Sequence, residues 1–153
     1  MKVAFDTNVL MYAEGIDTLE KRDIAIGVIA EIPRDNAVIP LQALGESFHV
    51  LIRKGKRTRS EAQTTILGWL DAYTTVPTTA EVLAAAADLA AEHRLAIWDA
   101  VILAASSQAG CRLLLTEDLQ DGFRWGGVTV ANPFASPRHP LLAAALARSG
   151  PLS

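Results

Sequence analysis

The alternation of apolar and polar segments along the chain predicts a domain in which strands alternate with helices. Short β-prone runs occupy residues 2–5, 37–39, 112–115 and 128–131. Between them, apolar residues recur at helical three- and four-residue steps, or form Ala-rich stretches, over 19–32, 41–53, 79–93 and 97–109. This order predicts a three-layer α/β/α fold with a mainly parallel central sheet.

Polar and glycine residues mark where several of these elements begin and end. Thr58 with Glu61, and Thr78 with Glu81, fit the capping-box pattern, so helices are expected to begin near residues 59 and 79. Gly110 follows the last long helix as a stop signal. We expect residues 6–8 to form a turn that opens a helix through about 13, and residues 116–127 to form a polar loop.

Composition limits the classes of protein that remain. The chain has 153 residues, half of them hydrophobic, which suits one domain with one core. A net charge of -3 gives no general attraction for nucleic acid, so a polyanion would need a local basic patch or a metal ion. The single cysteine, Cys111, excludes an internal disulfide and favours a cytoplasmic protein. We expect neither a secretory signal nor a membrane span, because acidic residues interrupt each apolar stretch.

Three aspartates stand where a parallel sheet would gather them. Asp6 follows the first strand and Asp118 follows the strand at 112–115, so both are expected at the carboxyl edge of the sheet, where ligands bind in such folds. Asp99 has apolar helical neighbours, among which a lone carboxylate is costly. The alternatives are a helix cap for Asp6 or Asp99 and an Asx turn for Asp118. Glu46 lies on a polar helix face, which by itself indicates only solvation.

Clustered carboxylates repel one another unless a cation neutralises them, and oxygen ligands favour Mg²⁺ or Mn²⁺. Such a site can activate water for attack on a phosphodiester. Thr7 and Asn8 are candidates to orient Asp6, and Asp121 is a secondary candidate in the acidic loop. We find no nucleotide-binding glycine loop or spaced zinc-ligand motif in the sequence.

Four short motifs together resemble the PIN-domain family, especially the VapC-type toxins of bacterial toxin-antitoxin pairs. They are the run Asp6-Thr7-Asn8-Val9-Leu10, Glu46 on the third helix, Trp98-Asp99-Ala100, and Thr116-Glu117-Asp118-Leu119. The resemblance covers residues 1–134 and leaves 135–153 as an extension, expected to be a short helix packed on the domain or on a partner.

This resemblance implies a Mg²⁺- or Mn²⁺-dependent endoribonuclease. Its metal ligands and catalytic residues would be Asp6, Glu46, Asp99 and Asp118, supported by Thr116. The resemblance also implies an antitoxin partner and a homodimer.

One dense basic run supplies candidate RNA contacts: Arg53, Lys54, Lys56, Arg57 and Arg59. The alternative for these residues is a solvated loop. Two other functions remain open at this point. One is a PIN-type nuclease of RNA maturation or repair, which would lack an antitoxin. The other is a non-catalytic binding scaffold of the same fold.

Overall fold

A six-stranded, mostly parallel sheet forms the centre of the computed structural model, which describes residues 1–147. The strand order is β3-β2-β1-β4-β6-β5, and β5 alone among the described strands pairs antiparallel, with β6. The strands are β1 (Val3–Phe5), β2 (Ala37–Pro40), β3 (Thr74–Val76), β4 (Leu113–Leu115), β5 (Arg124–Trp125) and β6 (Val128–Ala131).

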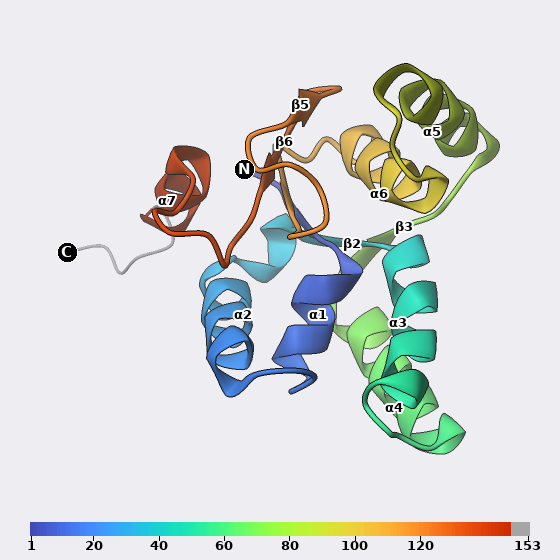
Figure 1. Cartoon of the computed structure of the whole chain (residues 1–153), viewed down its shortest axis with the longest axis vertical. Coiled ribbons are helices and arrows are strands. Elements are labelled where there is room, and N and C mark those ends of the chain that lie inside the picture. Colours follow the sequence, from blue (N-terminus) through green and yellow to red (C-terminus); the bar gives the residue numbers. More distant parts are fainter. Residues whose placement is uncertain (148–153) are drawn as a thin grey trace.

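Helices connect β1 to β2, β2 to β3 and β3 to β4, whereas a loop and β5 connect β4 to β6 (Figure 1). They are α1 (Thr7–Ala13), α2 (Leu19–Glu31), α3 (Leu41–Arg53), α4 (Arg59–Ala72), α5 (Ala80–His93), α6 (Ile97–Gln108) and α7 (Pro140–Ala147), with a short 3-10 turn at Arg34–Asn36. The chain moves outward from β1 to β3 and then returns across the sheet to β4. Because such crossovers share one hand, α1–α4 cover one face and α5–α6 the other. The expected three-layer α/β/α fold with a mainly parallel sheet is confirmed.

The chain adds β2 and β3 on one side of β1 and then adds β4 on the other side. The point between β1 and β4, where the order of strand addition reverses, is the switch point of the sheet. β1 pairs in parallel with β2 on one side and with β4 on the other. Every residue of β1 and β4 is buried, as expected for central strands covered on both faces. The segments that follow these two strands, beginning at Asp6 and Thr116, therefore leave the sheet at adjacent points of the same edge.

The structure adds two strands that the hydrophobic pattern does not predict. β3 is a three-residue edge strand with two threonines, too short and too polar to give an apolar run. β5 pairs with β6 through the two-residue turn Gly126–Gly127, in which both glycines have positive φ. This glycine pair is a hairpin signal, so part of the expected loop at 116–127 was predictable as a strand.

Threonine side chains cap the starts of α4 and α5. The Thr58–Glu61 capping box is present and begins α4, as predicted. The second box is wrong by one residue: Thr79, not Thr78, accepts the backbone N–H of Val82 and caps α5. The threonine closer to the helix provides the cap because its hydroxyl reaches the third helical residue.

The helix α7 lies in the segment 135–153, beyond the motifs noted in the sequence. Leu142, Ala145 and Leu146 of α7 are buried within the single chain and belong to its hydrophobic core. The last six residues of this segment lie outside the described residues. Among helices of the described part, none is long and apolar enough to cross a membrane.

Candidate metal centre

Asp6 occupies the first position after β1 and is almost fully buried, with 3% of its surface exposed. It is also the N-cap of α1, where its Oδ1 accepts the backbone N–H of Thr7 at 2.6 Å. Asp6 is therefore both the N-cap of α1 and a member of the acidic cluster. Its Oδ2 accepts the hydroxyl of Thr116 at 2.8 Å, which ties the end of β1 to the end of β4.

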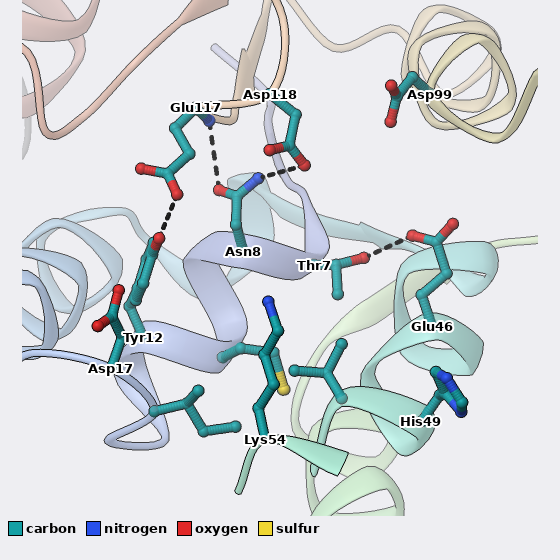
Figure 2. A pocket seen from close by; sticks show the side chains of 13 residues that line it. Thr7, Asn8, Tyr12, Asp17, Glu46, His49, Lys54, Asp99, Glu117 and Asp118 are labelled. Atoms are coloured by element: carbon teal, nitrogen blue, oxygen red, sulfur yellow. Dashed lines mark hydrogen bonds between the residues drawn. The ribbon is translucent and has the colours of Figure 1, made fainter. Parts of the chain in front are cut away.

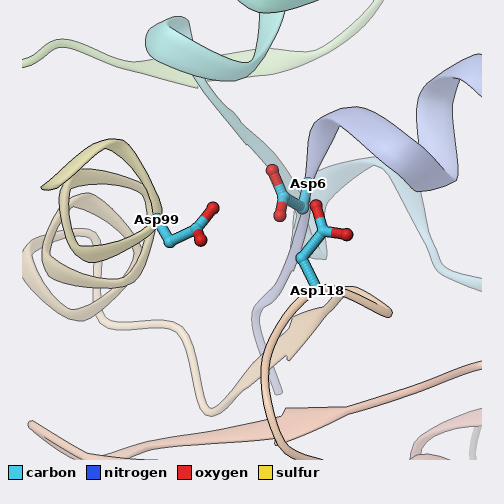
Figure 3. A group of neighbouring side chains, drawn as sticks. All are labelled: Asp6, Asp99 and Asp118. Carbon is cyan, nitrogen blue, oxygen red and sulfur yellow. The ribbon is translucent and has the colours of Figure 1, made fainter. Parts of the chain in front are cut away.

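Asp99 and Asp118 complete a compact cluster with Asp6. One carboxylate oxygen from each of the three lies within 4.8 Å of the others (Figure 3). Asp99 stands half-buried in the first turn of α6, and Asp118 stands exposed in the loop after β4. The side chains converge from three different elements, so the fold brings together residues that are up to 112 positions apart in the sequence.

The electrostatics of this cluster suit a bound cation. Burial raises the pKa of Asp6 to about 7, helped by the nearby charges of Asp118 and Glu46 and opposed by the hydrogen bonds from Thr116 and Thr7. Burial and the same two acidic neighbours also raise the pKa of Asp99. Holding all of these carboxylates ionised therefore requires a compensating positive charge. An all-oxygen donor set of this kind fits a hard divalent ion such as Mg²⁺ or Mn²⁺.

A hydrogen-bond network orients the aspartates, and Figure 2 shows its bond between Asn8 and Asp118. The amide Nδ2 of Asn8 donates to Thr116 Oγ1 at 2.9 Å and to Asp118 Oδ2 at 3.1 Å. The backbone N–H of Asp118 also donates to Thr116 Oγ1. Thr116, which is fully buried, thus links Asp6 to the loop of Asp118.

Glu46 lies beside the aspartate cluster. Its Oε2 accepts a hydrogen bond from the hydroxyl of Thr7 at 2.9 Å (Figure 2). Its negative charge contributes to the raised pKa of both Asp6 and Asp99. It is not among the oxygens that lie within 4.8 Å of one another. The helix face of Glu46, interpreted from the sequence as a solvated surface, is therefore one wall of the site.

Asp121, the secondary candidate of the acidic loop, has its carboxylate hydrogen-bonded at the end of β6. Its Oδ1 accepts the backbone N–H of Asn132 at 2.8 Å, which closes the acidic loop onto the end of β6. That carboxylate supports the path of the loop and is not among the grouped ligand oxygens.

A cleft of about 790 Å³ leads away from the aspartates between α1 and α3. Asp99, Asp118 and Glu46 line one end, and Met11, Ile16 and Val50 supply apolar walls farther along. His49 and Lys54 also line it (Figure 2). The cleft is thus acidic at one end and has apolar walls and the cationic side chain of Lys54 farther along.

The five basic residues predicted as RNA contacts do not share one environment. Arg57 donates to Glu14 Oε1 at 3.0 Å and to Thr65, so it ties α1 to α4. Arg53 is hydrogen-bonded to His49, and the guanidinium of Arg59 lies over Phe48. Lys56 is exposed, with φ 55°, in the turn after α3. Lys54 is the member of this set that lines the cleft in the described chain.

Sequence reasoning missed an ionic network on the far wall of the cleft. Glu117 accepts hydrogen bonds from the Tyr12 hydroxyl and from Lys21 Nζ, the latter at 2.9 Å. The bonds to Glu117 and Tyr12 raise the pKa of Lys21. The position of Glu117 beside Asp118 was a signal that it matters, whereas Lys21 carries no local signal because its partner is 96 residues away.

This architecture defines a class: an α/β domain with a cluster of aspartates at the switch point of its sheet. The chain belongs to the PIN domain family, whose model matches residues 3–124. No curated protein matches the sequence significantly. The matched residues include Asp6, Asp99 and Asp118, and the family predicted from four motifs is confirmed.

Solved structures with the same fold include several bacterial toxin-antitoxin proteins. A chain of a Klebsiella pneumoniae toxin-antitoxin complex has a TM-score of 0.65 and 18% identity, covering 87% of this chain and 98% of that one. The sarcin-ricin-loop-cleaving toxin VapC20 of Mycobacterium tuberculosis has a TM-score of 0.64 and 17% identity, covering 74% and 87%. FitAcB of Neisseria gonorrhoeae gives 0.63 and 17%, covering 86% and 98%. At these identities the likeness concerns the fold.

Proposed function

We propose that this protein is a Mg²⁺- or Mn²⁺-dependent endoribonuclease and acts as the toxin of a toxin-antitoxin pair. The observation that carries the proposal is the convergence of Asp6, Asp99 and Asp118 within 4.8 Å at the mouth of a cleft. Membership of the PIN domain family supports nuclease activity, and the toxin-antitoxin structures of the same fold support the toxin role.

The three aspartates would hold the ion, with Glu46 beside them as a fourth acidic group. A bound divalent ion supplies an activated water and stabilises the charge on the leaving oxygen of a phosphodiester. Asp6 is held in place by Thr116 and Thr7, so its carboxylate needs little rearrangement. Thr7 fixes Glu46 by its hydroxyl, on the side of the site from which substrate in the cleft would approach.

RNA would enter along the cleft, with its scissile phosphate at the acidic end. Lys54 is suited to bind a neighbouring phosphate, because it lines the same cleft and is exposed. Such a contact would position the strand without reading its sequence. Arg57, in contrast, is committed to Glu14 and is not proposed as a contact.

The same cleft is where an antitoxin segment would act as an inhibitor. A segment with a cationic side chain for the acidic end and apolar side chains for Met11, Ile16 and Val50 would match its lining. An adjacent gene encoding such a partner would separate the toxin from a nuclease of RNA maturation. Co-expression followed by co-purification and loss of cleavage tests this part of the proposal.

We also propose that the protein is a cytoplasmic homodimer. Leu41, Ile97 and Trp98 lie in the first turns of α3 and α6, two helices that contact each other, and are 37%, 38% and 51% exposed. Large exposed apolar side chains favour burial against another surface. Light scattering on the purified chain should give a dimer, and Trp98→Ala should shift it toward monomer. A monomeric wild type at micromolar concentration would refute the dimer.

The decisive experiment is cleavage of structured RNA by the purified protein with Mg²⁺ or Mn²⁺, with EDTA as a control. Asp6→Asn and Asp99→Asn should abolish cleavage while each variant remains folded by circular dichroism. A wild type that is inactive in both metals across varied RNAs would overturn the enzymatic proposal. Variants that cleave as well as the wild type would overturn the assigned site.

A further inference from the structure

Glu117 is next to Asp118 in the sequence, yet its carboxylate has partners outside the aspartate cluster. Tyr12 of α1 donates its hydroxyl to Oε1, and Lys21 of α2 donates to Oε2 at 2.9 Å. Figure 2 shows the Tyr12 contact on the side of the cleft opposite Glu46. Both oxygens of Glu117 are thus engaged, and its charge is balanced by an ammonium group.

Lys21 is seated firmly enough to act as an anchor. Its Nζ lies 4.7 Å from the centre of the Tyr12 ring and 5.5 Å from that of Phe134, and it also donates to the Tyr12 hydroxyl at 3.2 Å. The two rings meet edge to face at 5.0 Å. Cation-π contacts and a charge-assisted hydrogen bond together favour a single position for this side chain. The side chains of Lys21 and Glu117 are 33% and 23% exposed.

A short chain of hydrogen bonds leads from this anchor to Asp118. The backbone N–H of Glu117 donates to Asn8 Oδ1 at 3.3 Å, and Asn8 Nδ2 donates to Asp118 Oδ2 at 3.1 Å. The amide of Asn8 can bridge the two residues only if the loop places Glu117 N–H in front of it. Fixing the side chain of Glu117 therefore restricts where the carboxylate of Asp118 can lie.

We propose that Lys21 is a positioning residue for the metal centre: through Glu117 and Asn8, it holds the loop that presents Asp118 to Asp6 and Asp99. The proposal rests on the proposed function insofar as the aspartates bind a divalent ion. It assigns a role to α2, an element that supplies none of the grouped carboxylates. Outer groups that orient metal ligands typically change metal affinity by about ten- to a hundredfold when removed.

The test is a Mn²⁺ titration of the full chain, followed by calorimetry or by the electron paramagnetic resonance of free Mn²⁺. Lys21→Met keeps the stem between the two rings but removes the charge, and should weaken Mn²⁺ binding about tenfold. Lys21→Arg, which can still pair with Glu117, should recover most of the affinity.

Arg57→Met is the matched control because Arg57 forms a comparable, part-buried ion pair with Glu14 at 3.0 Å, and neither residue lines the cleft. It should lower the thermal midpoint as Lys21→Met does but leave the Mn²⁺ affinity unchanged. An equal loss of affinity in both variants would mean that Lys21 contributes only general stability, and would overturn the positioning role.

A double-mutant cycle tests the route through Glu117. In a Glu117→Gln background, Lys21→Met should cause no further loss of Mn²⁺ affinity. Additive losses would overturn the route, and so would tighter binding by Lys21→Met, which would mean that the released Glu117 joins the cluster. A wild type that binds no Mn²⁺ would also overturn the proposal. Because the readout is metal binding, a chain that binds Mn²⁺ but cleaves no RNA would refute only the proposed function.

Discussion

The hydroxyl of Thr116 donates to Asp6 Oδ2 at 2.8 Å across 110 positions of sequence. Thr116 Oγ1 also accepts hydrogen bonds from the amide of Asn8 and from the backbone N–H of Asp118. One buried threonine therefore connects the carboxylate after β1 with the loop after β4. This connection joins the two strand ends beneath the aspartates that we propose as metal ligands.

Replacing Thr116 by valine should weaken Mn²⁺ binding by about tenfold or more, because Asp6 loses a donor and two donors lose their acceptor. Thr116→Ser keeps the hydroxyl and should bind Mn²⁺ nearly as well as the wild type. Calorimetric titration of the three proteins measures the difference. Equal affinities for the valine and serine variants would show that the hydroxyl has no part in the site.

The stability of the metal-free protein should depend on the titration of Asp6. Its pKa is raised from 3.8 to about 7 in the folded chain, mainly by burial. Between these values the unfolded state loses a proton that the folded state keeps, so this residue's contribution to the unfolding free energy falls as pH rises toward 7. The stabilisation by the buried carboxyl is complete below about pH 4 and is lost above about pH 7.

Urea unfolding of the wild type and Asp6→Asn in EDTA, from pH 5 to pH 8, isolates this effect. Asparagine does not titrate, so the stability of the variant relative to the wild type should increase with pH. Saturating Mn²⁺ at pH 8 should stabilise the wild type but not the variant, and so offset this relative gain of the variant. A difference that stays constant across the pH range would contradict the raised pKa.

Parts of this site follow from local sequence, for identifiable physical reasons. Asp6 and Asp118 are predictable because each follows a strand, and parallel strands end at one edge. Asp99 is predictable because a carboxylate among apolar helical neighbours needs compensation, and the structure leaves it half-buried with a raised pKa. Glu46 cannot be predicted from local sequence, because its periodicity places it on a polar helix face. Only the packing of α1 beside α3 makes that face a wall of the cleft.

Tertiary contacts also explain what was missed. The partnership of Lys21 with Glu117 depends on where α2 begins relative to a loop 96 residues later, which no local pattern encodes. The five basic residues near the end of α3 look equivalent in sequence, but Arg57 is bound to Glu14 and Lys54 lines the cleft. The run of basic residues predicts a basic region. Which of these residues can contact a ligand depends on the direction in which each side chain points.

Asp99→Asn should reduce metal-dependent RNA cleavage by more than about a hundredfold, since losing a ligand is expected to cost at least as much as losing an orienting group. Asp88→Asn is a suitable control: Asp88 is an exposed acid on α5, and the substitution makes the same change in net charge. Initial rates at saturating Mn²⁺, compared for the two variants, measure the effect. Equal losses would point to net charge in place of a specific ligand.

Lys54 provides a test of the path of RNA that is independent of the metal. Removing one phosphate contact should reduce the slope of log affinity against log salt by about 0.7 for a single strand. We expect Lys54→Ala to show this change with uncleaved RNA bound to the Asp99→Asn protein. Lys56→Asn is the matched control, because it removes one positive charge two residues away and asparagine tolerates the positive φ of that position.

Fluorescence anisotropy at several salt concentrations gives both slopes. Kinetics should agree: Lys54→Ala should raise KM several-fold and leave kcat nearly unchanged, because a remote phosphate contact is made equally in the ground state and the transition state. If Lys56→Asn reduces the slope as much as Lys54→Ala does, RNA responds to the general charge of this turn, and the cleft between α1 and α3 is not its path.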